Sequence, residues 1–225
     1  MIEIPRISGG SMSPNGRIFV YLETETLWSD NKIVDRRRIL DLETGEFLTG
    51  PPAQEQDENQ SRVWWKPDGS GFAFLEKPEG DDHRQAYFFD LATEDVTQLT
   101  DHSEAIARLI WRRDGRGFYF IAAAQQSNGD GQLLADGWII PPFESNANRE
   151  IWEVDLETRT TNPVVAGGFS VQQVTLSRDG RYLTYSRRPD HKYDSAFAGE
   201  VIVHDVETTE ARRWTANAHG EALPR

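Results

Sequence analysis

Four copies of one pattern run along this chain of 225 residues. Each copy contains a short apolar segment, a turn with Asn-Gly or Asp-Gly, a second apolar segment, a variable loop and a segment that closes with Asp-Leu-x-Thr or Asp-Val-x-Thr. The two markers keep their order at intervals of roughly 45 to 65 residues, which is the length scale of propeller blades and exceeds that of helical-pair repeats. The pattern therefore predicts an all-β repeat protein.

The first marker is a hairpin signal. Asn-Gly and Asp-Gly tolerate the positive φ that a tight two-residue turn requires, and aromatic and β-branched residues flank them in segments such as 72–75 and 118–121. We therefore expect a two-residue hairpin in each copy. Structural roles are expected for the four turn glycines, which are Gly16, Gly69, Gly115 and Gly180.

The second marker ends the third segment of each copy. An aspartate at this point can accept hydrogen bonds from the backbone amides that follow it, which turns the chain toward a fourth strand. The candidates for the fourth strand are short and polar, as the exposed rim of a blade should be. The closing aspartates, which are also expected to be structural, are Asp41, Asp90, Asp155 and Asp205.

Four antiparallel strands in a unit that must bury its faces against neighbours are typical of a β-propeller blade. We predict one array over residues 1–225, with four-stranded antiparallel blades at approximately 11–50, 62–101, 107–167 and 171–217. The end of the chain, at 222–225, reads like the beginning of a further innermost strand. The expected fold is thus a partial propeller of about four blades.

Composition narrows the classes of partner. Lys and Arg total 24 against 37 Asp and Glu, and the formal charge of −13 repels nucleic acids and anionic membrane surfaces. The absence of cysteine excludes disulfides, thiolate zinc sites and a cysteine nucleophile. No apolar run approaches the length of a membrane span, and no signal peptide is visible after Met1. We expect an acidic, soluble protein of the cytoplasm, or of the periplasm if a signal peptide was removed.

Candidate chemical residues are few, and we predict no catalytic, cofactor-binding or metal-binding residues. The histidines lack the spacing of a zinc site, although His204 falls on a strand as a core or rim residue. Glu23 and Glu25 share a face, which favours a solvated edge over a glycosidase pair.

The segment Asn128-Gly129-Asp130-Gly131 lacks the later carboxylate of a calcium loop. It belongs to a long insertion at 125–149, which is either mobile or recruited for binding. The remaining histidines are His83, His102, His191 and His219. The tryptophans that we assign mainly to the core are Trp64, Trp65, Trp111 and Trp152.

Three segments carry a resemblance to a known family. They are Ser11-Met12-Ser13-Pro14-Asn15-Gly16-Arg17, Gln98-Leu99-Thr100-Asp101-His102, and Asp136-Gly137 followed by Arg149-Glu150-Ile151-Trp152-Glu153-Val154-Asp155. With the blade markers, they resemble TolB-like repeats, which are related to WD repeats. Their order is most similar to the N-terminal propeller of the prolyl oligopeptidase family, in its acylaminoacyl-peptidase and dipeptidyl-peptidase branch. The resemblance implies a propeller of six to eight blades that caps an α/β-hydrolase and filters substrates by size.

The chain departs from that family in one large respect. The G-x-S-x-G motif that holds the nucleophile is absent, and the nearest segments, 10–13 and 168–172, both lack the second glycine. We therefore expect no enzymatic activity from this chain by itself. The first hypothesis is a non-catalytic module that binds a protein or peptide as part of a larger protein or complex. The alternatives are the substrate-gating propeller of a serine peptidase and a stand-alone scaffold subunit. Self-association, missing blades or a hydrolase domain would cover the open blade faces.

Overall fold

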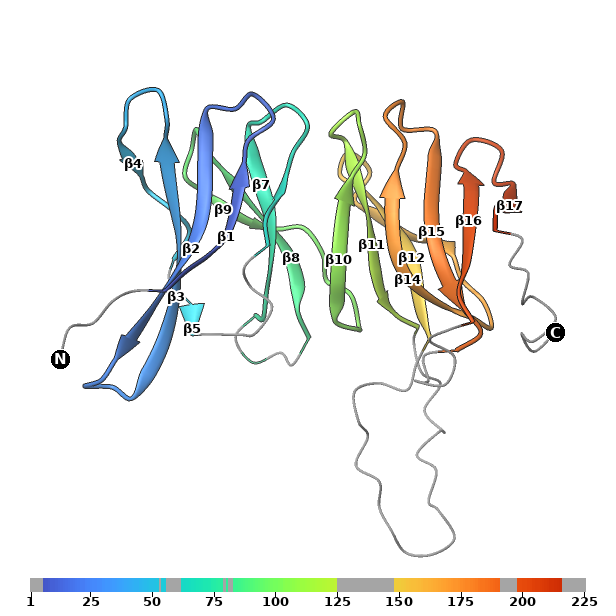
Figure 1. The fold of residues 1–225 in the computed structure, drawn as a ribbon, viewed down its shortest axis with the longest axis horizontal. Coiled ribbons are helices and arrows are strands. Elements are labelled where there is room, and N and C mark those ends of the chain that lie inside the picture. Colours follow the sequence, from blue (N-terminus) through green and yellow to red (C-terminus); the bar gives the residue numbers. More distant parts are fainter. Residues whose placement is uncertain are drawn as a thin grey trace, which may run out of the picture. The chain divides into compact units, whose positions relative to one another are not determined.

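The computed structural model describes residues 6–52, 54–55, 62–78, 80, 83–124, 148–190 and 198–215. The expected features at 125–147, together with His191, His219 and the segment 222–225, lie outside these ranges. The described strands form open antiparallel sheets in which the strands follow one another in chain order (Figure 1). The chain divides into two compact units, Met1–Asp101 and His102–Arg225, each with two sheets.

The unit Met1–Asp101 contains sheet 1 and sheet 2. Sheet 1 consists of β1 (Arg6–Met12), β2 (Ile18–Leu27), β3 (Lys32–Asp41), β4 (Phe47–Leu48) and β5 (Gln54–Glu55). Sheet 2 consists of β6 (Trp64–Trp65), β7 (Gly71–Glu76), β8 (Gln85–Asp90) and β9 (Val96–Gln98). Sheet 1 has one strand more than expected because β3 is ten residues long, and it pairs with β4 near one end and with β5 further along.

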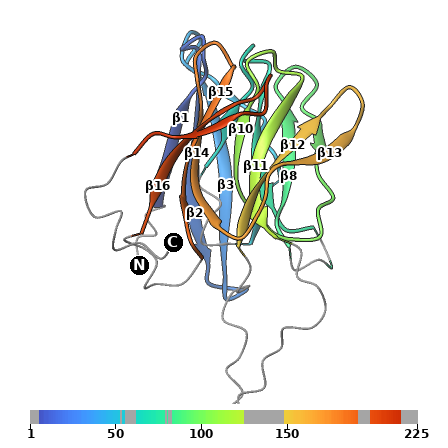
Figure 2. The same cartoon turned by 90° about the vertical axis from the view of Figure 1, so that its right-hand side faces the viewer.

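The unit His102–Arg225 contains sheet 3 and sheet 4. Sheet 3 consists of β10 (Ile106–Trp111), β11 (Gly117–Ala123), β12 (Arg149–Asp155) and β13 (Thr160–Val165). Sheet 4 consists of β14 (Ser170–Leu176), β15 (Tyr182–Arg188), β16 (Glu200–Asp205) and β17 (Ala211–Arg213). Figure 2 shows β13 next to β12 at the edge of sheet 3. The predicted fold class, an all-β propeller-type array of antiparallel sheets, is confirmed, whereas the single array over residues 1–225 stays a prediction.

Each unit has a core made by two successive sheets. In the first unit, Ile18, Val20 and Ile39 of sheet 1 pack against aromatic side chains of sheet 2 such as Phe72 and Phe89. The second unit joins the two sheets in the same way; its cluster contains Tyr119, Ile121 and Ile151 of sheet 3 with Val174, Leu176, Leu183, Tyr185 and Ile202 of sheet 4. Alternation along each strand places these residues on one face, which is why a period of two in the sequence yields a sheet core.

The four marker turns differ from the expected two-residue hairpin. In the first turn the amide of Gly16 donates to the carbonyl of Ser13 at 2.9 Å, so that Pro14 and Asn15 occupy the centre and the glycine follows them. Only the glycine has a positive φ, whereas a two-residue turn of the primed type would require two such residues. The φ values are 74° at Gly16, 73° at Gly69, 67° at Gly115 and 81° at Gly180.

Candidate functional site

The side chain before each turn glycine fixes the turn. The Oδ1 atom of Asn15 accepts a hydrogen bond from the amide of Arg17 at 3.1 Å. The same bond recurs from Ser70 to Asp68 at 2.9 Å, from Arg116 to Asp114 at 2.9 Å and from Arg181 to Asp179 at 3.1 Å. Short side chains with an acceptor oxygen can close such a local ring, which explains why Asn or Asp stands before the glycine in every copy.

The closing aspartates form a second set of local rings. Asp41 Oδ1 accepts hydrogen bonds from the amides of Glu43 at 2.9 Å and Thr44 at 3.4 Å. The equivalent amides donate to Asp90, Asp155 and Asp205 at distances between 2.8 and 3.2 Å. The residue after the threonine has a positive φ in every copy; these residues are Gly45, Glu94, Arg159 and Thr209. Three of the four are not glycine, a feature that the sequence pattern did not reveal.

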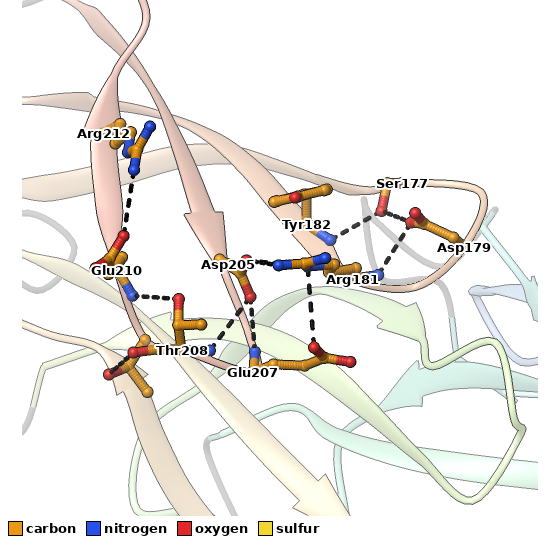
Figure 3. A network of polar contacts seen from close by, with 10 residues as sticks. Ser177, Asp179, Arg181, Tyr182, Asp205, Glu207, Thr208, Glu210 and Arg212 are labelled. Carbon is orange, nitrogen blue, oxygen red and sulfur yellow. Dashed lines mark hydrogen bonds and ion pairs between the residues drawn. The ribbon is translucent and has the colours of Figure 1, made fainter.

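Arginines connect the two sets of rings in sheets 1 and 4. Arg17 donates to Asp41 through Nε at 3.0 Å and Nη2 at 2.7 Å, and Arg181 contacts Asp205 in the same way at 3.0 and 2.8 Å. In sheet 4 this network also includes the hydroxyl of Ser177, which accepts from the Tyr182 amide at 2.8 Å (Figure 3). An arginine after the turn glycine with an aspartate at the end of the third strand was a signal that could have been read from the sequence.

The hydrogen bonds from Arg17 hold the pKa of the Asp41 carboxyl below its ordinary value, and the amides of Glu43 and Thr44 act in the same direction. A carboxylate whose pKa is depressed in the folded state stabilises the fold above its unfolded pKa of about 3.9, and this contribution is lost as the pH falls through the folded value. We expect Arg17→Ala to raise the pKa of Asp41, as measured by a carboxyl NMR titration. Acid unfolding should consequently move to a higher pH.

Arg116→Ala is the matched control for this titration. Arg116 also follows a turn glycine, but Asp155 contacts Arg112 instead, at 3.3 Å. The pKa of Asp155 is lowered first by the amide of Thr158, and we expect it to stay lowered in Arg116→Ala. An unchanged Asp41 titration in Arg17→Ala would contradict the assigned role of this pair.

A groove of about 540 Å³ lies between sheets 3 and 4 of the second unit. Arg112 is its central cation and contacts Asp114 at 2.6 Å, Glu153 at 3.3 Å and Asp155 at 3.3 Å. From the other side, sheet 4 contributes residues that include His204, Val206 and Thr209. The turn arginine Arg113 also lines the groove. It donates to the carbonyls of Ser177 and Leu176, both at 3.1 Å, and thereby fastens sheet 3 to sheet 4.

Burial favours the neutral forms of Tyr119 and His204 in the groove. Burial, together with the charge of Glu153, raises the pKa of the Tyr119 phenol to about 12. Burial also lowers the pKa of His204, which is only 6% exposed and therefore neutral at pH 7. A bound polar group could therefore exchange hydrogen bonds with the phenol of Tyr119, the imidazole of His204 and the ion pairs of Arg112. Of these residues, only His204 was predicted from the sequence as a residue of interest.

The serines nearest to the nucleophile motif have structural partners. Ser11 Oγ accepts from Trp65 Nε1 at 3.2 Å, and Ser13 Oγ donates to Asn15 Oδ1 at 2.7 Å. Ser170 is fully buried and accepts from the Arg149 amide and from Gln172 Nε2, both at 3.2 Å. These hydroxyls support turns and strands.

The other candidates have local structural contacts. Glu23 and Glu25 are on β2, which is an internal strand and not the expected edge, and they contact Arg38 at 3.2 Å and Arg36 at 3.4 Å. His102 Nδ1 accepts from the Glu104 amide at 3.1 Å, and its ring stands edge-on to Trp152 with the ring centroids 4.8 Å apart. His83 is half-buried, as are Trp64 and Trp65, whereas Trp111 is only 5% exposed.

Two further findings concern the described ranges alone. Within them, no three His, Asp or Glu side chains converge closely enough to hold a metal ion. No helix in this part of the chain has the length and apolar character needed to cross a bilayer.

Comparison with solved structures supports the architecture. TolB from Acinetobacter baumannii superimposes with a TM-score of 0.59 at 18% identity, over 94% of this chain and 44% of that one. An acylaminoacyl peptidase in complex with Z-Gly-Gly-Phe-chloromethyl ketone gives 0.62 at 15%, over 94% and 32%. The β-propeller domain of the Trilobed protease from Pyrococcus furiosus, described as having an open velcro topology, gives 0.61 at 15%, over 94% and 57%.

These likenesses establish the fold, and the chain spans between 32% and 57% of the length of the three structures. No curated protein matches the chain in sequence. The family profile of the prolyl oligopeptidase N-terminal β-propeller domain, however, matches residues 59–215, which is well over half of the chain. The chain therefore belongs to the family of prolyl oligopeptidase N-terminal β-propeller domains.

Proposed function

We propose that this chain is a non-catalytic propeller module that binds a protein or peptide partner within a larger protein or complex. The observation that carries the proposal is the groove between sheets 3 and 4. Arg112 is paired with three carboxylates. Burial keeps the Tyr119 phenol protonated and the His204 imidazole neutral. Such a site presents hydrogen-bonding groups to a polar ligand without an activated nucleophile or a base beside one, as acyl transfer would require.

The proposal predicts that the isolated chain neither hydrolyses peptide or ester substrates nor reacts with a fluorophosphonate probe. The hydroxyl of Ser13 already donates to Asn15, and Ser170 is buried, so neither is activated for attack on an acyl group. Gel fluorescence after probe treatment measures the outcome, with an active serine peptidase as the positive control. Probe labelling that disappears on mutation of a single serine would overturn the non-catalytic assignment.

A second candidate function is the substrate-gating propeller of a serine peptidase. The family match over residues 59–215 favours it, because the matched domain is the N-terminal β-propeller domain of prolyl oligopeptidase. The discriminating observation is the encoded reading frame of the parent protein. A hydrolase domain with a G-x-S-x-G motif in the same frame would support gating, and a fusion to another type of domain would leave the binding module as the better explanation.

A further inference from the structure

An equivalent row of side chains crosses each sheet, and it is least buried in sheet 1. The strand register aligns Met12, Phe19, Leu40 and Phe47 across β1, β2, β3 and β4. The corresponding rows are Trp65, Phe72, Phe89 and Val96 in sheet 2; Trp111, Phe118, Val154 and Thr161 in sheet 3; and Leu176, Leu183, His204 and Ala211 in sheet 4. We call the row of sheet 1 the open row.

The rows of sheets 2 and 4 are covered by the preceding sheet of their own unit. Phe72 and Phe89 are at most 1% exposed and pack against sheet 1, and Leu183 is fully buried in the core shared with sheet 3. In the open row, by contrast, Met12 is 47% exposed, whereas its equivalents Trp111 and Leu176 are each 5% exposed. Phe19 and Leu40 are only half-buried, and the fourth-strand position, which Phe47 occupies here, is exposed in every sheet. An apolar row that is buried in its repeats and exposed here marks an interaction surface.

The residue after each closing aspartate shows the same contrast. Leu91 packs against the core of the first unit, and Val206 packs against the core of the second. Their equivalent in sheet 1 is Leu42, which is 47% exposed. Leu42 therefore extends the surface of the open row by one more apolar side chain.

Sheet 4 carries the equivalent of the sheet 3 face that lines the groove. Tyr119, Glu153 and Asn162 lie side by side in sheet 3 and line the groove that sheet 4 covers with His204 and Val206. The equivalent row of sheet 4 is Thr184, Val203 and Arg212. A hollow of about 450 Å³ lies on this face. Tyr182, Val203 and Trp214 line it together with Thr208 and the charged side chains of Arg181, Asp205, Glu210 and Arg212. Trp214 is 77% exposed.

The equivalents of His204 and Val206 in sheet 1 are Leu40 and Leu42. We propose that the open row of one copy docks onto the hollow of sheet 4 in a second copy, so that Leu40 and Leu42 cover it as His204 and Val206 cover the groove. The repeat supports this head-to-tail pairing because each row that is buried within a unit receives the opposite face of the preceding sheet. The inference rests on the proposed binding role and names a second copy of the chain as the partner.

The first test is the mass of the chain in solution. One chain has a mass of 25.6 kDa, so a head-to-tail pair has 2 × 25.6 = 51.2 kDa. Light scattering at micromolar concentration is expected to give this mass or a larger multiple of the mass of one chain. Each copy carries a formal charge of −13, so added salt should strengthen the association by screening. A monomer at all salt concentrations would overturn the proposal and assign the open row to another polypeptide.

Two variants locate the contact. Leu42→Asp is expected to weaken the association by about tenfold or more, because it places a charge in an apolar contact. Trp28→Asp is the matched control, since Trp28 is 63% exposed in the turn between β2 and β3 and is not in the open row. Circular dichroism should show that both variants fold. Equal loss of association in the two variants, or in neither, would contradict the assigned surface.

The orientation is tested by cross-linking, which is simple because the chain has no cysteine. Leu42→Cys and Trp214→Cys chains are mixed and treated with a short bis-maleimide. The head-to-tail contact predicts linked dimers in the mixture and none with either variant alone. Dimers from Leu42→Cys alone would show that two open rows meet, which overturns the orientation. The result is independent of the probe labelling, so failure here leaves the non-catalytic assignment intact.

Discussion

Phe72→Ala is expected to lower the free energy of unfolding by about 3 to 5 kcal/mol, the usual cost of removing a buried phenylalanine ring. Phe72 is fully buried and packs at the join of sheets 1 and 2. Its ring centroid lies 5.4 Å from that of Trp65 and 5.5 Å from that of Phe89. The loss therefore combines transfer of the ring to water with a cavity between two sheets. Urea unfolding followed by circular dichroism measures the change.

Trp28→Ala provides the control for this measurement. Trp28 is 63% exposed, so its loss should change the free energy of unfolding by less than about 0.5 kcal/mol. If Phe72→Ala unfolds at the same urea concentration as the native chain, the core assigned to the first unit is wrong.

Gly71→Ala is the second large effect, and we expect a loss of about 3 kcal/mol in the free energy of unfolding. A Cβ atom on Gly71 would clash with the carbonyl oxygen of Phe89 and would lie 2.6 Å from the ring of Phe88. Gly71 pairs with Asp90 across β7 and β8, and its carbonyl accepts from the Lys66 amide at 3.0 Å. The methyl group can therefore be accommodated only by separating the two strands.

Gly168→Ala is the matched control for this substitution. A Cβ atom at Gly168 would meet no atom within 4 Å. Its thermal midpoint should match that of the native chain, and the midpoint of Gly71→Ala should be clearly lower. Equal midpoints for the two variants would show that β7 and β8 do not approach as described.

The repeat made the fold class predictable because local chemistry and long-range packing agree in each copy. The Asp-Gly marker fixes a hairpin, and the closing aspartate fixes the next turn by hydrogen bonds within three residues. The turn type was predicted wrongly because both turns favour glycine as the second residue of the Asn-Gly or Asp-Gly pair. The observed turn needs a positive φ only at this glycine, whereas the expected primed turn needs it at both residues of the pair. The register of β5 on β3 depends on the unusual length of β3, which no marker encodes.

The groove could not be predicted from the sequence in the same way. Arg112, Tyr119 and Glu153 come from three different strands or turns, and only the register of β11 with β12 brings Tyr119 and Glu153 together. The raised pKa of Tyr119 follows from its burial in a cluster that includes residues of sheet 4, which is a property of the packed unit. The Arg17 and Asp41 pair was within reach, because it links two markers that recur in sheet 4.

Arg113 links the groove to the packing of sheet 3 against sheet 4. The same guanidinium group lines the groove and fastens the β10–β11 turn of sheet 3 to the end of β14 through the carbonyls of Leu176 and Ser177. Binding of a ligand in the groove would therefore be coupled to the packing of sheet 3 against sheet 4, and the coupling would act in both directions. A bound ligand that drew Arg113 away from these carbonyls would loosen the join between the sheets, and a ligand that contacted both sheets with Arg113 in place would strengthen it.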